Sequence, residues 1–282
     1  MNAGNPSRRV LLRGAVCAAA LALGANAARA DEAYDRIRAT GTLKVAVYKE
    51  FFPFSDDNAG IDIDIAHALA ASLGLKLALL PFDAGENMSD DLRNMVWKGH
   101  YLGYGPADVM LHVPVEKRLQ SSNEQVEIFA PYWRDELQIA RDKGRLPDWD
   151  GGYSAFEHEK IVVDGDSLSS IVMLGADGGK YRNNVINARS ANEALATFKR
   201  HEAAAIMATR SELDAGLAGL PDIGREKVVQ PGVPIGGWVV GMAVKAESRD
   251  LAHTLQDAMN KLIDSGAMKD IFERNHVRYT KP

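Results

Sequence analysis

Cysteine is almost absent from this sequence, because Cys17 is the only one among 282 residues. A single thiol near the N-terminus leaves the rest of the chain without a disulfide framework and without cysteine ligands for a metal. Long apolar runs are scarce too, since nothing after residue 30 approaches the roughly 18–20 apolar residues of a membrane helix. We therefore expect no membrane span, and a core that forms by apolar packing alone.

Catalytic and nucleotide-binding signatures are also missing. The chain has no Ser-His-Asp motif, no P-loop and no nucleophile elbow, and its "GYGPAD" (103–108) leads into a predicted strand rather than a helix. We expect a protein that is not an enzyme and has no cofactor. The alternative is an enzyme that uses a carboxylate, such as a dehydratase, and only Glu50 and Glu86 are loose candidates for that group.

The first thirty residues have the pattern of an export signal. Arg8, Arg9 and Arg13 precede an apolar run at 15–25, and "AARA" at 27–30 offers a small-x-small cleavage site. The Arg8-Arg9 pair also fits a twin-arginine signal, although paired arginines occur in ordinary signals as well. We expect a periplasmic protein.

Cleavage after Ala30 predicts Asp31 as the mature N-terminus and changes the charge. Four arginines are lost and no acid, which leaves 29 Lys and Arg against 38 Asp and Glu, so the net charge moves from −5 to −9. Such an acidic protein is a poor candidate for binding nucleic acid, whose phosphates need a basic surface. It suits a basic protein partner or a cationic ligand.

Apolar periodicity predicts an α/β fold. A β-rich segment at 41–57 is followed at 60–74 by a helix whose apolar residues lie four apart, and then by a strand at 75–82. Strand, helix and strand with short connections form a βαβ unit, which implies a parallel sheet.

The same alternation continues, and two α/β blocks with a late return strand predict two lobes crossed twice by the chain. The first part of lobe 1 would be 31–134, lobe 2 would be 135–235, and the C-terminal part of lobe 1 would be 236–282. A cleft between the lobes is where a ligand is expected. We predict further strands at 107–113, 135–142 and 237–245. We predict further helices at 90–99 and at 248–277, the latter interrupted at Gly266. The segments 160–174 and 190–214 are predicted to contain both strand and helix.

Residues 41–77, 107–133 and 250–277 resemble the type II periplasmic solute-binding proteins. The resemblance extends over 41–277 and implies their fold, with two lobes and a central cleft. Within it, 84–118 resembles the MxaJ/XoxJ branch, and we favour XoxJ.

That branch implies a periplasmic accessory protein of a PQQ-dependent, lanthanide-type methanol dehydrogenase, which it would help to activate or assemble. The implied partner is the XoxF/MxaF-type dehydrogenase, with its cytochrome c as a further partner, and this chain would be a monomer. The alternative is a substrate-binding protein of an ABC transporter for a small solute.

The resemblance also implies a ligand site, and this chain departs from it. Arg118 matches the arginine that clamps a ligand carboxylate in amino-acid-binding relatives, although a solvated arginine is the competing interpretation. Where those relatives open a helix with Gly-Ser or Gly-Thr, this chain has Asp166 and Ser167, and we expect Asp166 to cap the helix. Where they place an acid for the ligand ammonium, the alignment gives Ala203 beside Glu202. Uptake of plain amino acids is therefore disfavoured.

Aromatic residues around glycines mark a second candidate surface. We assign Trp97, His100, Tyr101 and Tyr104, together with Phe52, to a cleft wall that binds a peptide segment or a protein surface, because Tyr and Trp are favoured at interfaces. Core packing is the alternative for Trp97.

Metal binding is disfavoured. His100 and His112 are twelve residues apart with no carboxylate at ligand spacing, and a hydrogen-bonded structural role fits His112 better. Glu86, Asp90 and Asp91 could contribute to a hard-cation site, but Asp90 and Asp91 also fit a helix N-terminus. We assign no metal ligand.

Overall fold

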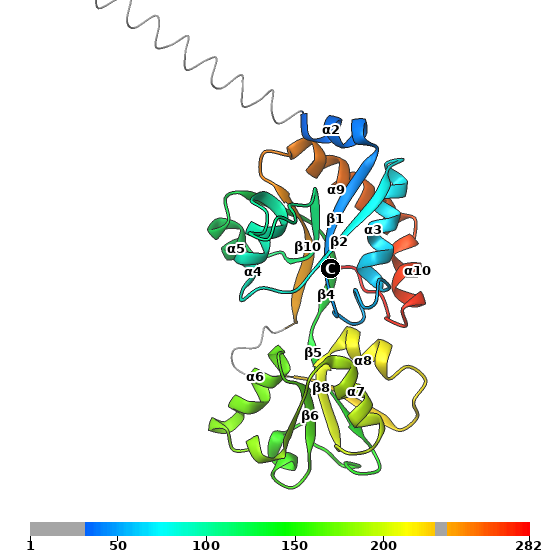
Figure 1. Cartoon of the computed structure of the whole chain (residues 1–282). Helices are drawn as coiled ribbons and strands as arrows, with labels where there is room; N and C mark the ends of the chain where they lie inside the picture. The colour runs from blue at the N-terminus through cyan, green and yellow to red at the C-terminus, as the bar shows by residue number, and fades with distance from the viewer. Residues whose placement is uncertain (1–31, 229–235) are drawn as a thin grey trace, which may run out of the picture.

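The computed structural model describes residues 32–228 and 236–282 and places them in two α/β lobes, each built on a five-stranded sheet (Figure 1). The predicted export signal and its cleavage point before Asp31 lie outside the described residues. Within residues 32–228 and 236–282, no helix is both long enough and apolar enough to cross a membrane.

Lobe 1 is built on a mixed sheet of order β2-β1-β3-β10-β4. Its first three strands are parallel, as the βαβ pattern predicts, and β10 runs antiparallel between β3 and β4. The strands are β1 (Thr42–Tyr48), β2 (Lys76–Phe82), β3 (Val109–Pro114), β4 (Val126–Asp135) and β10 (Trp238–Lys245). The helices of this lobe are α2 (Glu32–Thr40), α3 (Ile61–Ser72), α4 (Met88–Leu92), the π-turn η1 (Arg93–Trp97), α5 (Lys117–Ser122), α9 (Arg249–Asp264) and α10 (Ala267–Arg274).

Alternating side chains along β1 separate two apolar layers. Val45 and Val47 belong to a large cluster with α3, α9 and α10, whereas Ala46 and Tyr48 belong to a smaller cluster with α4 and η1. Successive side chains of a strand point to opposite faces, so an uninterrupted apolar run is what a sheet covered on both faces requires.

Lobe 2 repeats the arrangement with a sheet of order β7-β6-β8-β5-β9. One apolar cluster lies under α6, and another lies under α7 and α8. The strands are β5 (Leu137–Asp142), β6 (Ile161–Asp164), β7 (Val185–Ala188), β8 (Ala205–Thr209) and β9 (Ile223–Lys227). The helices are α6 (Leu168–Gly175), α7 (Ala191–Lys199) and α8 (Arg210–Gly216), with the short 3₁₀ turns η2 (Tyr153–Glu157), η3 (Ala176–Gly178) and η4 (Arg182–Asn184).

The chain crosses between the lobes twice (Figure 1). The chain passes from β4 into β5 through Glu136, and it returns to lobe 1 at the start of β10. Trp238 at that start is the ladder partner of Asp135 at the end of β4. The two crossings therefore lie side by side at residues 135–137 and 236–238, and we call these residues the hinge.

Most long periodic segments fold as predicted, with shifted ends. The predicted helix 60–74 is α3, and the predicted helix 90–99 is the end of α4 followed by the π-turn η1. The C-terminal helical stretch is α9 and α10, separated at Gly266, whose φ of +85° suits a residue without a Cβ. Strands β4, β7 and β9 were not predicted.

Candidate functional site

A cavity of about 350 Å³ opens between the two lobes at the hinge. This volume is in the range of small-molecule sites. We call it the cleft. Its wall is formed by residues of both lobes and of the hinge: Glu50, Phe51, Phe52, Phe54, Ala84, His112, Asp135, Leu137, Asp164, Asp166, Ser167, Leu168, Ser169, Ala191, Thr209, Glu212 and Trp238.

The lobe 1 side of the cleft is aromatic. The rings of Phe51 and Phe54 stack with centroids 5.4 Å apart, and the His112 ring meets both edge-on at 4.7 and 4.2 Å. Phe52 reaches across and packs against the apolar cluster under α7 and α8. Aromatic faces of this kind attract cations as well as apolar groups.

The His112 ring is held by a buried polar network. Its Nδ1 lies 3.1 Å from Asp62 Oδ2, and the Tyr132 hydroxyl donates to Asp62 Oδ1 at 2.8 Å. The same hydroxyl accepts a hydrogen bond from the His112 backbone N–H at 2.9 Å. His112 thus has the hydrogen-bonded environment that its strand context predicts.

The lobe 2 and hinge side of the cleft is acidic. Four of the five carboxyl side chains that line the cleft come from lobe 2 and the hinge, and the fifth comes from lobe 1, whereas no lysine or arginine is among the lining residues that the structure describes. The five are Glu50, Asp135, Asp164, Asp166 and Glu212. His112 is the one other titratable group in the described lining, so the cleft favours positive charge.

Three of these carboxyl groups have raised pKa values. Burial raises the pKa of Glu212 to about 7, and the nearby carboxyls of Asp135 and Asp164 add to the rise against the opposing hydrogen bonds from Thr209. Burial also raises the pKa of Asp135, which accepts hydrogen bonds from the Ser211 hydroxyl and amide. Burial raises that of Asp164, and the charge of Asp166 contributes. A cation in the cleft would reverse this tendency by stabilising the ionised forms.

Two helix starts position the lobe 2 carboxyls. Thr209 is the N-cap of α8, and the Glu212 side chain accepts from the Thr209 backbone N–H at 2.7 Å, which completes a capping box. At α6 the N-cap is Ser167, whose hydroxyl accepts from Ser170 N–H. The prediction that Asp166 caps this helix is wrong: Asp166 lies one residue too early, and its carboxylate stays at the rim of the cleft.

Of the eight residues assigned to the cleft from the sequence, Phe52, Asp166 and Ser167 line it. The other five do not, which corrects their placement as a cleft wall. They are Trp97, His100, Tyr101, Tyr104 and Arg118. Whether they contact a partner stays a prediction.

The loop after η1 explains the misplaced aromatics. Trp97 and Tyr104 pack against the smaller apolar cluster of lobe 1, as the core alternative for Trp97 proposed. The His100 ring stacks on Tyr104 at 4.3 Å, whereas Tyr101 is 88% exposed. The loop therefore folds onto its own lobe and presents one tyrosine to solvent.

Arg118 lies in the first turn of α5 and is exposed. Because β3 ends at Pro114 and the chain leaves the sheet there, the guanidinium does not reach the cleft wall. The cleft therefore lacks the carboxylate clamp that the resemblance implied.

The acids of the α4 region have structural roles. Asn87 caps α4 by accepting from Asp90 N–H, and the buried Asp91 accepts hydrogen bonds from the Tyr48 hydroxyl and Gly85 N–H. Glu86 is exposed nearby. Across residues 32–228 and 236–282, no three His, Cys, Asp or Glu side chains come together as a metal site.

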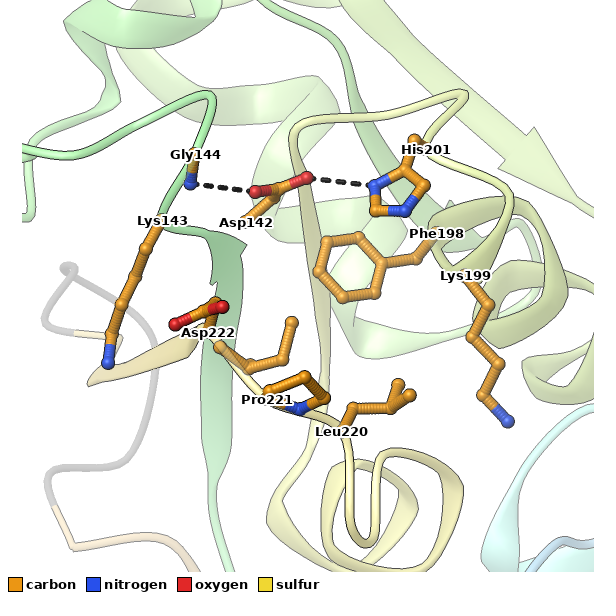
Figure 2. Close-up of a pocket in the computed structure, with 10 residues that line it drawn as sticks. Asp142, Lys143, Gly144, Phe198, Lys199, His201, Leu220, Pro221 and Asp222 are labelled. Carbon is orange, nitrogen blue, oxygen red and sulfur yellow. Dashed lines mark hydrogen bonds and ion pairs between the residues drawn. The ribbon is translucent and has the colours of Figure 1, made fainter.

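A further cavity of about 530 Å³ lies wholly within lobe 2 (Figure 2). The Asp142 carboxylate accepts from Gly144 N–H and lies 2.9 Å from the His201 ring, above the apolar side chain of Phe198. Asp142 ends β5, whereas Leu137 at the other end of the strand lines the cleft. The two cavities are therefore separated by the length of a strand.

Known proteins share this architecture. One is an ancestral cationic amino acid solute-binding protein, which matches this chain with a TM-score of 0.65 and 18% identity. The match covers 86% of this chain and 98% of that protein. An amino acid ABC transporter substrate-binding protein from Streptococcus pneumoniae bound to L-arginine matches 86% of this chain and 97% of its own, with a TM-score of 0.60 and 19% identity.

The fold is that of the type II periplasmic solute-binding proteins. The predicted fold class is thereby confirmed.

Sequence comparison adds one curated relative. Cyclohexadienyl dehydratase from Pseudomonas aeruginosa is 39% identical over 80 residues, which is 27% of this chain and 30% of that enzyme. No family model matches the chain. The chain therefore matches under a third of this relative's length. Neither the sequence comparison nor the structural comparison distinguishes the MxaJ/XoxJ branch from other proteins of this fold.

Proposed function

We propose that this protein is an exported solute receptor whose cleft binds a small organic cation, in the manner of the substrate-binding proteins of ABC transporters. The observation that carries the proposal is the composition of the cleft: five carboxyl groups face aromatic rings, and its described lining contains no lysine or arginine. An acidic site with aromatic faces suits an amine or guanidine attached to an apolar stem.

The same lining selects against a free carboxylate on the ligand. A zwitterionic amino acid needs a cationic or hydrogen-bonding partner for its carboxylate, and Arg118, the predicted clamp, lies outside the cleft. Burying a carboxylate beside Asp164 and Asp166 without such a partner is costly. The ligand that fits is a cation without an α-carboxylate.

The structural comparisons support the cationic part of this proposal. One neighbour is an ancestral cationic amino acid solute-binding protein, and another was solved with L-arginine bound. The match to cyclohexadienyl dehydratase extends over only 80 residues. We therefore retain a binding role without catalysis as part of the proposal.

Calorimetric titration with matched ligands tests it. Agmatine is arginine without its carboxylate, and cadaverine has the same relation to lysine. We expect both amines to bind more tightly than their parent amino acids. Micromolar binding of arginine with no binding of agmatine would contradict the proposal.

A second candidate function is the accessory role at a PQQ methanol dehydrogenase. The observation that favours it is the exposure of Tyr101 (88%) and Leu102 (67%) at the tip of the loop after η1. Neighbouring exposed apolar side chains on an ordered loop are typical of a protein contact. Its test is a pull-down and activity assay with purified dehydrogenase, in apo and metal-loaded form, at low salt. Absence of binding to either form would count against this role.

A further inference from the structure

A second pocket, of about 570 Å³, lies at the hinge, and none of its described lining residues also lines the cleft. Side-chain alternation explains why. Asp135 and Leu137 line the cleft, whereas Arg134 and Glu136, their neighbours along the same extended segment, line the second pocket. Because successive side chains of a strand point to opposite faces, the pocket lies on the other face of the hinge. We call it the hinge pocket.

Four cationic side chains line the hinge pocket against one carboxylate. Lys227 pairs with Glu136 at 3.0 Å, which leaves Arg134, Arg210 and Arg278 without an ion pair in the described part of the chain. Hydrogen bonds and nearby cations outweigh the effect of burial and lower the pKa of Glu136, which keeps its carboxylate ionised. The described lining of the pocket therefore carries an excess of three positive charges.

Arg210 is the most buried of the three arginines that line the pocket. Its side chain is buried, with only 7% of the residue exposed, and its guanidinium lies 4.4 Å above the ring of Trp133. Its Nη2 donates to the Arg134 carbonyl and the Thr280 hydroxyl, both at 2.8 Å. A buried guanidinium that forms no ion pair within the described residues is costly, and the cost is relieved when an anion binds.

Among the described residues that line the pocket, Glu136 is the one carboxylate, and it already pairs with Lys227. An anion from solution would supply the compensating charge.

We propose that the hinge pocket binds a small multivalent oxyanion, whose oxygens accept from the guanidinium groups of Arg134, Arg210 and Arg278. Planar guanidinium donors match the geometry of phosphate and carboxylate groups. Phosphates and di- or tricarboxylates share this chemistry.

The three arginines come from different parts of the fold. Arg134 is in β4 and Arg278 is in the C-terminal segment of lobe 1, whereas Arg210 begins α8 of lobe 2. An anion that contacts all three bridges the lobes on the face opposite the cleft. It therefore favours one hinge angle over others, and its affinity is linked to that of a cleft ligand.

Titration of the purified exported chain tests the proposal. Phosphate, sulfate and citrate are added at constant ionic strength, with chloride as the reference, and binding is followed by calorimetry and by Tm. We expect saturable binding of at least one multivalent anion. Competition between phosphate and citrate would place both in one pocket, and binding of citrate alone would assign the site to carboxylates.

Matched variants locate the site. Arg210→Gln removes a buried side chain, and a variant that failed to fold would give no information on binding. The test therefore rests on the exposed Arg278→Gln, which is expected to weaken binding by about tenfold. Lys76→Gln, an exposed cation on β2, should leave affinity unchanged. The proposal is overturned if the folded protein binds none of the three anions saturably, or if Lys76→Gln weakens binding as much as Arg278→Gln. Neither outcome depends on which ligand the cleft takes.

Discussion

The imidazole Nδ1 of His112 lies 3.1 Å from the carboxylate of Asp62, and both side chains are buried. Asp62 also accepts from the hydroxyl of Tyr132. One carboxylate thus ties helix α3 to strands β3 and β4, directly behind the aromatic wall of the cleft.

Asp62→Ala should destabilise lobe 1, because it leaves the Tyr132 hydroxyl and the His112 ring without their shared partner. We expect a loss of about 2–4 kcal/mol in the free energy of unfolding, measured by urea titration. Asp64→Ala on the same helix is the control, since Asp64 forms an exposed ion pair with Arg274 and should cost less than about 1 kcal/mol. Equal losses in both variants would contradict the role of Asp62.

Glu212 should make stability depend on pH. Its folded pKa of about 7 lies above its ordinary value of 4.5, so the folded state holds the proton more tightly. Stability contributed by this group is then fully present below about pH 4.5 and is lost as the pH rises through 7. The loss amounts to at most about 3 kcal/mol.

Glu212→Gln keeps a capping side chain on Thr209 N–H but cannot ionise, so the difference in unfolding free energy between variant and wild type should grow between pH 4.5 and 7. Asp135 and Asp164 titrate in both proteins, and their coupling to Glu212 is part of the measured difference. The control is Glu193→Gln, at the same position of the capped helix α7. A difference that does not change with pH would refute this assignment.

Asp166→Asn should weaken binding of agmatine or cadaverine. The carboxylate lies at the cleft rim, where removing one of five acidic groups lowers the attraction for a cation. We expect a three- to tenfold loss of affinity by calorimetry, or about 1 kcal/mol. Asp148→Asn, an exposed acid of lobe 2 outside the cleft, should change affinity by less than twofold.

Tyr101→Ala should leave Tm unchanged, because the side chain is 88% exposed, and should reduce capture of the dehydrogenase if this loop is the contact. Tyr104→Ala removes a ring that stacks on His100 and packs on the core, so it should also lower stability, by about 1–2 kcal/mol. Lys281→Ala is the neutral control for both. Undiminished capture by Tyr101→Ala would exclude the loop tip.

Periodicity predicted the elements that carry strong apolar patterns. The stripe at 60–74 identifies α3, and the apolar run at 107–113 identifies β3. Strand β9 carries the polar sequence "IGREK", and its place in the sheet comes from backbone pairing with β5. The sequence of such an edge strand has no apolar pattern that predicts it, because the strand is stabilised by a partner more than eighty residues away.

The candidate site was harder to predict. Asp135, Asp164 and Glu212 are far apart in the sequence, and only the folding of both sheets brings them to one cleft. Their positions at strand ends could have indicated the site, because Asp135 and Asp164 each end a strand and Glu212 follows β8 closely. The aromatic loop misled the prediction because glycines and tyrosines mark exposed loops and ligand sites alike.

The pairing of Trp238 with Asp135 makes lobe 2 an insertion with adjacent ends. β4 and β10 are ladder partners from Val126 to Asp135, so their pairing continues up to the point where lobe 2 is inserted. A genetic replacement of the whole intervening segment by a tight turn would convert these strands into a hairpin. The remaining sheet, with its helices on both faces, would then be a half-size protein suitable for isolated study.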